Sequence, residues 1–245
     1  MKLSVVIPAY NEEGSIEKTT LAFDAELNKQ KIDHEILVVN DGSKDKTESI
    51  LKKLSSKNKN LRYVNNPTPG GFGLAVRCGL DNFNGDYAAI VMADMSDDPK
   101  NLVKMYKKAV REDLDAVFGS RFHPESKVSD YPKFKLFINR IVNFFIKILF
   151  FINYNDTTNA FKLYKKETIK GISPLISKHF NLTVEMPLKT IIRGYSYAVI
   201  PTNWTNRTTG ESKLRLKEMG SRYLFIILYS LVEKFFSRGD YRKKK

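Results

Sequence analysis

The stretch YAAIVMADMSDDPKNL, residues 87–102, joins an apolar run to a cluster of carboxylates within a few positions. Residues 87–92 are apolar and bounded by polar residues, which is typical of a buried strand. Asp94, Asp97 and Asp98 follow, and Pro99 then opens a stretch with helical spacing. Because Pro is favoured at the first helical position, we expect Asp98 to cap that helix. The stretch therefore predicts a strand, an acidic loop and a helix in succession.

The rest of the first 120 residues repeats this alternation of apolar runs with amphipathic stretches. The apolar runs cover 3–7, 35–40, 61–64, 87–92 and 115–119, and helix-like segments lie near 13–30, 45–57, 72–82 and 99–112. Strands separated by helices of this length indicate the α/β class, with a mostly parallel sheet flanked by helices. Ligands of such sheets bind at the carboxyl ends of the strands. The polar segments PAYNEE, NDGSKDKT, NNPTPGGFG and ADMSDDP, each following a strand, are therefore the expected binding site.

These polar ends match neither a dinucleotide fingerprint nor a P-loop. A carboxylate at the end of a parallel strand can instead hold Mg²⁺, which takes one or two protein carboxylates and completes its shell with water and phosphate oxygens. Asp94 is placed for that role, and Asp97 is a possible second ligand, directly or through water. Asp41 could accept a hydrogen bond from a base N–H or a ribose hydroxyl, although Asp41-Gly42-Ser43 also fits a plain turn.

The chain is basic, with 41 Lys and Arg against 27 Asp and Glu among its 245 residues. This excess favours an anionic partner: a phosphate-bearing substrate, an anionic membrane or nucleic acid. We expect no nucleic acid, because no recognition motif occurs and basic and aromatic residues do not interleave outside the apolar helices. Cys78 is the single cysteine, so no internal disulfide can form, and Pro8 interrupts the first apolar run too early for a secretory signal. A reducing compartment is expected.

Two apolar segments distinguish the second half of the chain. LFINRIVNFFIKILFFI, residues 136–152, carries Asn139, Asn143 and Lys147 in one narrow polar stripe at helical spacing. As a helix of about 26 Å interrupted by cations, it favours an interfacial position in the headgroup plane over a membrane span, and a buried core helix is the alternative. Residues 222–236 are again apolar, and the basic tail SRGDYRKKK follows. The tail favours attraction to anionic lipid over a purely solvated role.

SVVIPAYNEE, ILVVNDGSKDKT, ADMSDDP and GSRF, in this order, resemble the family 2 glycosyltransferases, whose fold is of the GT-A type. NDTTNAFKLYKKE (155–167), NLTVEMPLK (181–189) and WTNRTTGESKL (204–214) resemble the dolichol-phosphate mannosyltransferase branch. The resemblance covers nearly the whole chain. It implies inverting transfer of a sugar from a nucleotide sugar, GDP- or UDP-linked, to a membrane polyprenyl phosphate, with a divalent metal, Mg²⁺ or Mn²⁺, as cofactor.

The resemblance also assigns roles to individual residues. Asp94 corresponds to the second Asp of the family's Asp-x-Asp metal motif. Arg121 would face the donor diphosphate or the acceptor phosphate, and Arg207 and Lys213 would clamp phosphates. The nucleotide pocket would be lined by Pro8, Tyr10, Glu12, Asp41 and Gly71.

The chain departs from the family pattern at two positions. Met92 stands where the family has the first Asp of the metal motif, and Asn40 stands where an Asp is common. A thioether is a soft ligand and binds Mg²⁺ poorly. Both departures lower the negative charge of the expected donor site.

We divide the chain into three parts, on the basis of the resemblance and of the change from short apolar runs in the first half to long apolar segments in the second. Residues 1–125 are the nucleotide-sugar-binding part, 126–215 the acceptor-binding part with the interfacial helix, and 216–245 a C-terminal amphipathic helix with a basic tail. The expected location is peripheral or monotopic, on the cytoplasmic face of a membrane.

Chemistry also favours a phosphate acceptor. Transfer to a hydroxyl needs a general base, whereas a phosphate monoester, with a second pKa of about 6, is already anionic at neutral pH. The alternatives are a saccharide or lipid hydroxyl acceptor, with Asp156 or Glu185 as the base, and a catalytically degenerate, membrane-associated binding subunit, which Met92 suggests. The histidines His34, His123 and His179 form no evident dyad and are expected to be structural.

Overall fold

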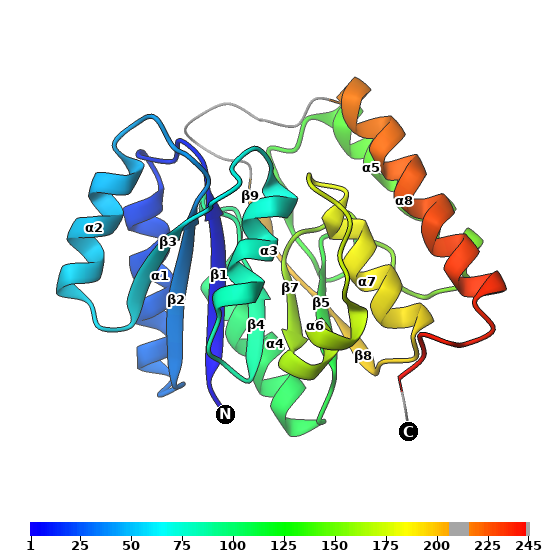
Figure 1. The fold of residues 1–245 in the computed structure, drawn as a ribbon, viewed down its shortest axis with the longest axis horizontal. Coiled ribbons are helices and arrows are strands. Elements are labelled where there is room, and N and C mark those ends of the chain that lie inside the picture. The colour runs from blue at the N-terminus through cyan, green and yellow to red at the C-terminus, as the bar shows by residue number, and fades with distance from the viewer. Residues whose placement is uncertain (206–215, 244–245) are drawn as a thin grey trace.

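A seven-stranded sheet with helices on both faces forms the centre of the molecule, in a computed structural model that describes residues 1–205 and 216–243 (Figure 1). The strand order is β3-β2-β1-β4-β7-β5-β8, and a separate two-stranded sheet pairs β6 with β9. The strands are β1 Leu3–Ala9, β2 His34–Asn40, β3 Leu61–Asn65, β4 Tyr87–Ile90, β5 Ala116–Ser120, β6 Val128–Ser129, β7 Lys162–Lys165, β8 Tyr197–Pro201 and β9 Trp204–Thr205. The helices are α1 Ile16–Lys29, α2 Thr47–Lys57, α3 Phe72–Asn82, α4 Pro99–Arg111, α5 Lys133–Phe150, α6 Lys166–Ile172, α7 Leu182–Ile192 and α8 Leu216–Phe236.

The strand pairing confirms the predicted mostly parallel sheet. β1 pairs with β2 and β4 in parallel, and β2 with β3 and β5 with β8 likewise. β7 is reversed, because it runs antiparallel to both β4 and β5. It therefore begins at the edge of the sheet where β4 and β5 end, and this brings the segment before β7 to the binding edge.

Alternating side chains of the central strands build two cores. Val5 and Ile7 of β1 belong to a core with α1, α2 and α4, whereas Val6 belongs to the core on the opposite face, with α3, α6 and α7. Every residue of β1 and β2 is buried, and each strand carries a continuous apolar run, 5–9 in β1 and 36–39 in β2, as expected for strands that are covered on both faces. At α4 the predicted cap is confirmed: the Asp98 side chain accepts a hydrogen bond from Lys100 N, and Pro99 is the first helical residue.

The parts proposed from the sequence share this one sheet. β8 lies beyond residue 125 and pairs with β5, which lies before it. The boundaries at 125 and 215 remain predictions.

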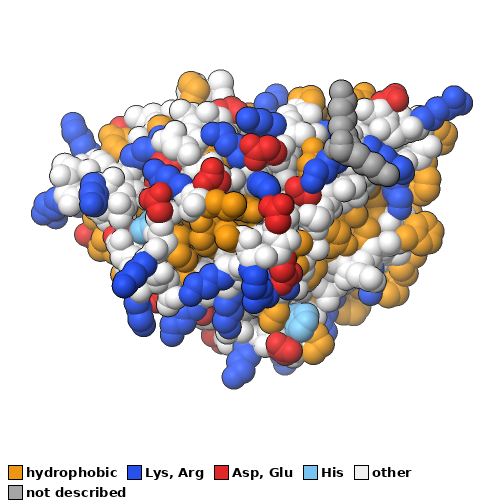
Figure 2. Space-filling model, turned by 90° about the horizontal axis from the view of Figure 1, so that it is seen from below, with side chains coloured by type: hydrophobic (Ala, Val, Ile, Leu, Met, Phe, Trp, Pro, Cys, Tyr) orange, Lys and Arg blue, Asp and Glu red, His pale blue; other side chains and the backbone are white. Residues whose placement is uncertain are grey.

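Exposed hydrophobic side chains of α5 and α8 form a surface that we call the α5–α8 apolar face. It consists of exposed side chains of α5 (Phe134, Phe137, Phe144, Phe145, Ile148) and α8 (Leu224, Phe225, Leu228, Val232, Phe236). Figure 1 places the two helices side by side, and Figure 2 shows hydrophobic side chains gathered at the same end of the molecule. Among the described residues, no helix has the length and apolar character needed to cross a membrane.

The polar stripe of α5 is oriented differently along its length. Asn143 is 1% exposed and points into the protein, whereas Lys147 is exposed. Ile146 and Phe150 also point inward, but the many exposed apolar side chains show that α5 is not the buried core helix that was the alternative interpretation.

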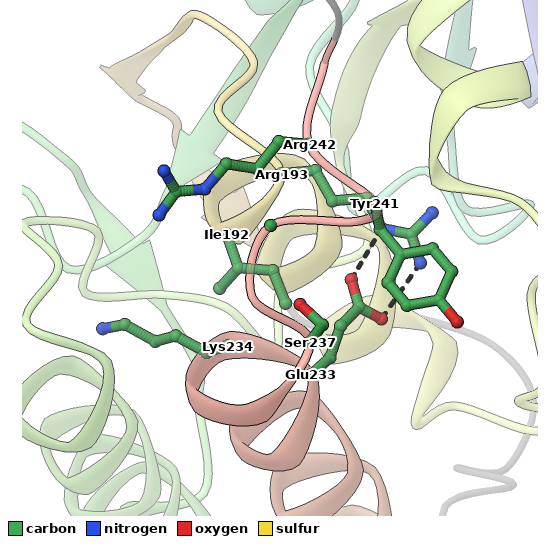
Figure 3. Close-up of a pocket in the computed structure, with 8 residues that line it drawn as sticks. Ile192, Arg193, Glu233, Lys234, Ser237, Tyr241 and Arg242 are labelled. Carbon is green, nitrogen blue, oxygen red and sulfur yellow. Dashed lines mark hydrogen bonds and ion pairs between the residues drawn. The ribbon is translucent and has the colours of Figure 1, made fainter.

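Three contacts hold the C-terminal end of α8 and the tail after it against the rest of the protein, and Figure 3 shows the first of them. Arg193, which follows α7, forms a buried ion pair with Glu233 of α8, with its Nε 2.7 Å from Oε1. Lys234 Nζ donates to the carbonyl of Phe150 at 2.6 Å. Lys243 Nζ lies 2.7 Å from an Asp115 carboxylate oxygen. Lys243 of the basic tail is therefore docked on the protein, a role that the lipid-attraction hypothesis did not foresee.

Candidate active site

The ends of β1, β2 and β4 converge at one edge of the sheet. Parallel registers place Pro8 opposite Val39 and Val6 opposite Ile90. Beyond the strands, Asp41 N donates to Ala9 O at 2.8 Å and Val91 N donates to Val6 O at 3.0 Å. Pro8, Asp41 and the loop that carries Asp94 therefore lie at the same edge, as the strand-end rule predicts.

The carboxylate of Asp41 holds the loop that follows β3. It accepts from the Nδ2 of Asn66 at 2.7 Å, and from the backbone N–H groups of Gly70 and Gly71, the latter at 3.1 Å. The neighbouring Asn40 donates from Nδ2 to Asn65 Oδ1 at 2.8 Å. Asp41 thus orders the glycine-rich loop, and its role toward a nucleotide remains a prediction.

Gly71 is required by close packing. A Cβ atom there would lie 2.4 Å from the carbonyl oxygen of Lys178 and 2.6 Å from Nδ1 of His179, so any side chain would force the backbone apart. The sequence suggested Gly71 only through the family resemblance. The structure adds that this glycine brings the start of α3 against the segment that leads into α7.

The loop after β1 carries the remaining pocket candidates. Tyr10 is 39% exposed at the strand end. The backbone N–H of Glu12 donates to Thr47 Oγ1 at 2.8 Å, and its Oε2 accepts from Ser15 Oγ at 3.0 Å. These contacts fix the loop between β1 and α2.

The acidic loop after β4 folds back on itself. Asp94 Oδ1 accepts from Ser96 N at 3.2 Å, and Met95 adopts a left-handed backbone with φ of 62°. Asp97 is buried, and its Oδ2 accepts from Met92 N at 2.9 Å. Burial and the nearby Asp94 raise the pKa of Asp97 to about 7, against the lowering effects of Met92 N–H, Arg121 and Lys162.

This loop fits a cation that is shared with a substrate. Within residues 1–205 and 216–243, no three His, Cys, Asp or Glu side chains come together as a metal cage. Mg²⁺, however, is often bound by one or two carboxylates and completed by substrate phosphates. Asp94 and Asp97, three residues apart, have carboxylates of this kind, and their role as metal ligands stays a prediction.

Arg121 and Asp156 form a buried ion pair at the same edge. The Nε of Arg121 donates to Asp156 Oδ2 at 2.9 Å and its Nη2 to Oδ1 at 2.7 Å. Burial acts to lower the pKa of Arg121, but the charge and hydrogen bonds of Asp156 raise it, so the guanidinium stays charged. Sequence reasoning placed Arg121 at a phosphate but missed this partner, because the pairing depends on the reversal of β7.

Lys162, the first residue of β7, is buried close enough to this pair to interact with both of its charges. Its Nζ donates to the carbonyls of Thr157 and Thr183 at 3.1 Å each, and also to that of Asn159. Burial lowers the pKa of Lys162 to about 7, with Arg121 acting in the same direction and Asp156 and Asp97 opposing. The lysine ties the segment that carries Asp156 to α7.

The two carboxylates considered as general bases are not available to a substrate hydroxyl. Asp156 has no exposed surface in its side chain, and both its oxygens accept from Arg121. Glu185 is also fully buried; it accepts from Ile176 N, Ser177 N and, at 2.8 Å, Lys189 Nζ. Neither carboxylate is placed to take a proton from a bound acceptor.

Two candidate residues lie outside the described residues, Arg207 and Lys213. Trp204, which immediately precedes that segment in β9, forms a β-bridge with Asp97. Its ring packs on that of Tyr131, with centroids 4.7 Å apart. Trp204 could not be predicted as a neighbour of the acidic loop, because no local sequence pattern predicts a two-residue strand.

The fold and this edge of the sheet define an α/β protein of the GT-A type. The sequence matches the family described as Glycosyl transferase family 2 over residues 4–172, and the chain belongs to that family. The resemblance noted from the motifs is thereby confirmed.

The names of two relatives match the branch suggested by the later motifs. The chain is 30% identical over 221 residues to "Dolichol-phosphate mannosyltransferase" of Pyrococcus furiosus, covering 89% of this chain and 60% of the relative. It is 28% identical to "Polyprenol monophosphomannose synthase" of Mycolicibacterium smegmatis, covering 86% of this chain and 80% of the relative. A third relative, "Glycosyltransferase AglD" of Haloferax volcanii, is 25% identical, and the chain spans only 36% of its length. The chain thus covers less than two thirds of two of these relatives.

Solved structures support the fold. Glucosyl-3-phosphoglycerate synthase of Mycobacterium tuberculosis in complex with UDP superposes with a TM-score of 0.72, at 17% identity, over 94% of this chain and 80% of that one. The same enzyme with Mn²⁺, UDP and phosphoglyceric acid gives a TM-score of 0.72 at 18% identity, over 94% and 78% of the two chains. At this identity the similarity establishes the fold.

Proposed function

We propose that this chain is an inverting glycosyltransferase that moves a sugar from a nucleotide sugar, GDP- or UDP-linked, to a membrane polyprenyl phosphate. The names of two relatives support the acceptor class. The observation that carries the proposal is the burial of Asp156 and Glu185 in ion pairs, which leaves a hydroxyl acceptor without either candidate base. A phosphate acceptor needs cations, and Arg121 supplies one at the edge that carries Asp94.

We assign separate roles to the residues at the strand ends: some would bind the cation, some the phosphates and some the nucleotide. Asp94 would hold a divalent cation, Mg²⁺ or Mn²⁺, with Asp97 as the second ligand, directly or through water. When bound, the cation offsets the negative charge that develops on the departing nucleotide diphosphate. Arg121, Arg207 and Lys213 would bind phosphate oxygens. The nucleotide itself would contact Pro8, Tyr10, Glu12, Asp41 and Gly71.

The α5–α8 apolar face is proposed to meet the membrane. Exposed aromatic and aliphatic side chains on α5 and α8 form this apolar surface, and the two helices lie side by side in Figure 1. A helix of this kind lies in the interface with its apolar side among the acyl chains. We infer a peripheral or monotopic protein on the cytoplasmic face, in line with the reducing compartment expected from the single cysteine.

A screen of radiolabelled nucleotide sugars against membranes containing polyprenyl phosphate tests this function. The expected product carries label into the organic phase and releases it in mild acid, because a sugar–phosphate diester to a lipid is acid-labile. Label found in a water-soluble saccharide, or in an acid-stable glycolipid, would support the hydroxyl-acceptor alternative instead.

Met92 favours a second candidate, the degenerate binding subunit. Such a chain would bind the nucleotide and the membrane but transfer no sugar. Calorimetric binding of a nucleotide sugar, without product from any donor in the screen, would distinguish it from the transferase.

A further inference from the structure

The inward side of α5 carries two asparagines beneath the α5–α8 apolar face. Asn139 and Asn143 are one helical turn apart, and Asn143 Nδ2 donates to Asn139 Oδ1 at 3.0 Å. A buried amide is unfavourable unless its donors and acceptor are satisfied. Apolar side chains would have been enough to pack α5 against the protein. The role of the two amides must therefore be sought in their hydrogen-bond partners.

The partners are the two threonines that directly follow Asp156. Asn143 accepts from Thr157 Oγ1 at 2.7 Å and donates to Thr158 Oγ1 at 2.9 Å. Thr158 Oγ1 in turn donates to Asn139 Oδ1 at 2.7 Å. The Thr158 hydroxyl thereby uses its single donor on α5, which fixes where its lone pairs point.

One lone pair of Thr158 Oγ1 accepts from Asn143, and the other faces Arg121. The Nη2 of Arg121 reaches Thr158 Oγ1 at 3.3 Å in addition to Asp156 Oδ1 at 2.7 Å. On the other side, Asn139 Nδ2 donates to Tyr131 Oη at 3.0 Å, and the ring of Tyr131 lies 5.9 Å from the Arg121 guanidinium carbon. Asn139 therefore contacts two groups that flank the guanidinium.

We propose that Asn139 and Asn143 are positioning residues that fix the guanidinium of Arg121 through Thr158 and Asp156. A planar guanidinium held through Nε and Nη2 presents its Nη1 edge away from Asp156 in one defined direction. Without the asparagine pair, Thr158 loses its fixed orientation and that edge can turn. The proposal rests on the proposed function only in assigning the acceptor phosphate as the group that Arg121 meets.

Acceptor kinetics of the full chain provide the first test, with Asn139→Ala and Asn143→Ala as variants. Each is expected to raise the KM for polyprenyl phosphate about tenfold while the KM for the nucleotide sugar changes by less than about twofold. Asn60→Ala is the matched control, because Asn60 donates to Asp24 in a part-buried cluster that includes His34, at the start of β2. This control is expected to lower the melting temperature comparably and to leave both KM values unchanged.

A spectroscopic test needs no substrate and separates this inference from the proposed function. The NMR resonance of Arg121 Nε–H can be assigned by its loss in Arg121→Lys. In Asn139→Ala it should shift, and its proton should exchange faster with water. Asn139 is only partly buried, so this variant is expected to fold. An unchanged resonance in that folded variant would overturn the positioning role, whatever the wild type transfers. Equal losses for donor and acceptor that scale with melting temperature would also overturn it. If the resonance moves but Arg121→Lys leaves the acceptor KM unaltered, the positioning role stands and the phosphate assignment fails.

Discussion

Arg121 and Asp156 are 35 positions apart in sequence, yet they share two hydrogen bonds of 2.9 and 2.7 Å in a buried pair. The pair lies at the carboxyl end of β5, because Arg121 directly follows β5 and Asp156 lies in the segment before the antiparallel β7. The threonines after Asp156 are connected to this contact, and through them so is α5.

The first prediction concerns the stability of this pair. We expect Asp156→Ala to lower the free energy of unfolding by about 3–5 kcal/mol, because it leaves the guanidinium of Arg121 buried without its counter-charge. Urea unfolding followed by circular dichroism would measure this change. Glu112→Ala, which removes an exposed ion pair with Lys108, is the control and should leave the midpoint unchanged. Equal midpoints for the two variants would contradict the prediction.

The second prediction concerns the departure at Met92. Asp94→Asn should reduce transfer by on the order of 100-fold or more, since it removes the main anionic ligand of the cation. Met92→Asp should stay active and bind Mg²⁺ or Mn²⁺ more tightly, because it restores a hard oxygen ligand two residues away. Metal-dependent transfer and metal titration of both variants would check this. Full, metal-dependent activity in Asp94→Asn would show that the cation is held elsewhere.

The third prediction is a pH dependence set by Asp97. Its pKa in the folded protein is about 7, above the ordinary value of 3.8, so the folded state binds more protons between these values. The free energy of unfolding therefore falls as the pH rises through this window, and the destabilisation by ionised Asp97 reaches its full value above pH 7. Asp97→Asn keeps an acceptor for Met92 N–H without the charge.

This variant should be more stable than wild type at pH 8, by roughly 2–4 kcal/mol, and little changed at pH 4. Chemical denaturation at the two pH values, without metal, measures the difference. If Asp97 supports the cation through water, metal affinity in the same variant should fall about tenfold. A stability difference that is the same at both pH values would refute the assigned pKa.

The fourth prediction uses two glycines as a matched pair. Gly71→Ala should destabilise the fold by roughly 1–3 kcal/mol, because the added methyl group meets the backbone oxygen of Lys178. Gly220→Ala, in α8, has nothing within 4 Å of the added atom and should be neutral or stabilising by about 0.5–1 kcal/mol. Thermal unfolding of both variants decides the matter, and a neutral Gly71→Ala would mean that the loop and the segment before α7 separate easily.

The fifth prediction concerns the membrane. Phe144→Asp in α5 and Phe225→Asp in α8 should each weaken pelleting with anionic vesicles at least tenfold, since both side chains lie on the α5–α8 apolar face. Leu21→Asp is the control, because Leu21 is also exposed but lies on α1. Vesicle sedimentation over a range of lipid concentrations provides the measurement. Loss of binding in the control alone would place the contact surface elsewhere.

The sequence predicted the first half of the fold closely, because strands buried on both faces give continuous apolar runs. The run at 35–40 corresponds to β2, and the cap at Asp98 was found from its pattern with Pro99. β7 was not predicted, since its four residues, Lys162–Lys165, include two lysines and resemble a loop. Its direction depends on pairing with distant strands, which no local pattern records.

Individual side-chain roles were harder to predict than elements. The sequence predicted a narrow polar stripe through Asn139, Asn143 and Lys147, but not that the amide of Asn143 would be satisfied inside the protein by Thr157 and Thr158. Asp97 as a second metal ligand stays a prediction, and its hydrogen bond from Met92 N, in a loop with a left-handed residue at Met95, could not be predicted from the sequence. Periodicity marks which residues share a face, and tertiary contacts decide whether that face meets protein or solvent.

The docking of Lys243 bears on how the molecule can be tethered. Its backbone N–H donates to the carbonyl of Arg193, the residue that also grips Glu233 of α8. A fluorescent domain or surface linker fused at the C-terminus would therefore strain the contacts of Lys243 with Arg193 and of Arg193 with Glu233. The N-terminus emerges at the edge of the sheet opposite to the end of β1 (Figure 1). A label attached at Met1 would therefore hang away from the strand ends and leave both the binding edge and the fastening of α8 undisturbed.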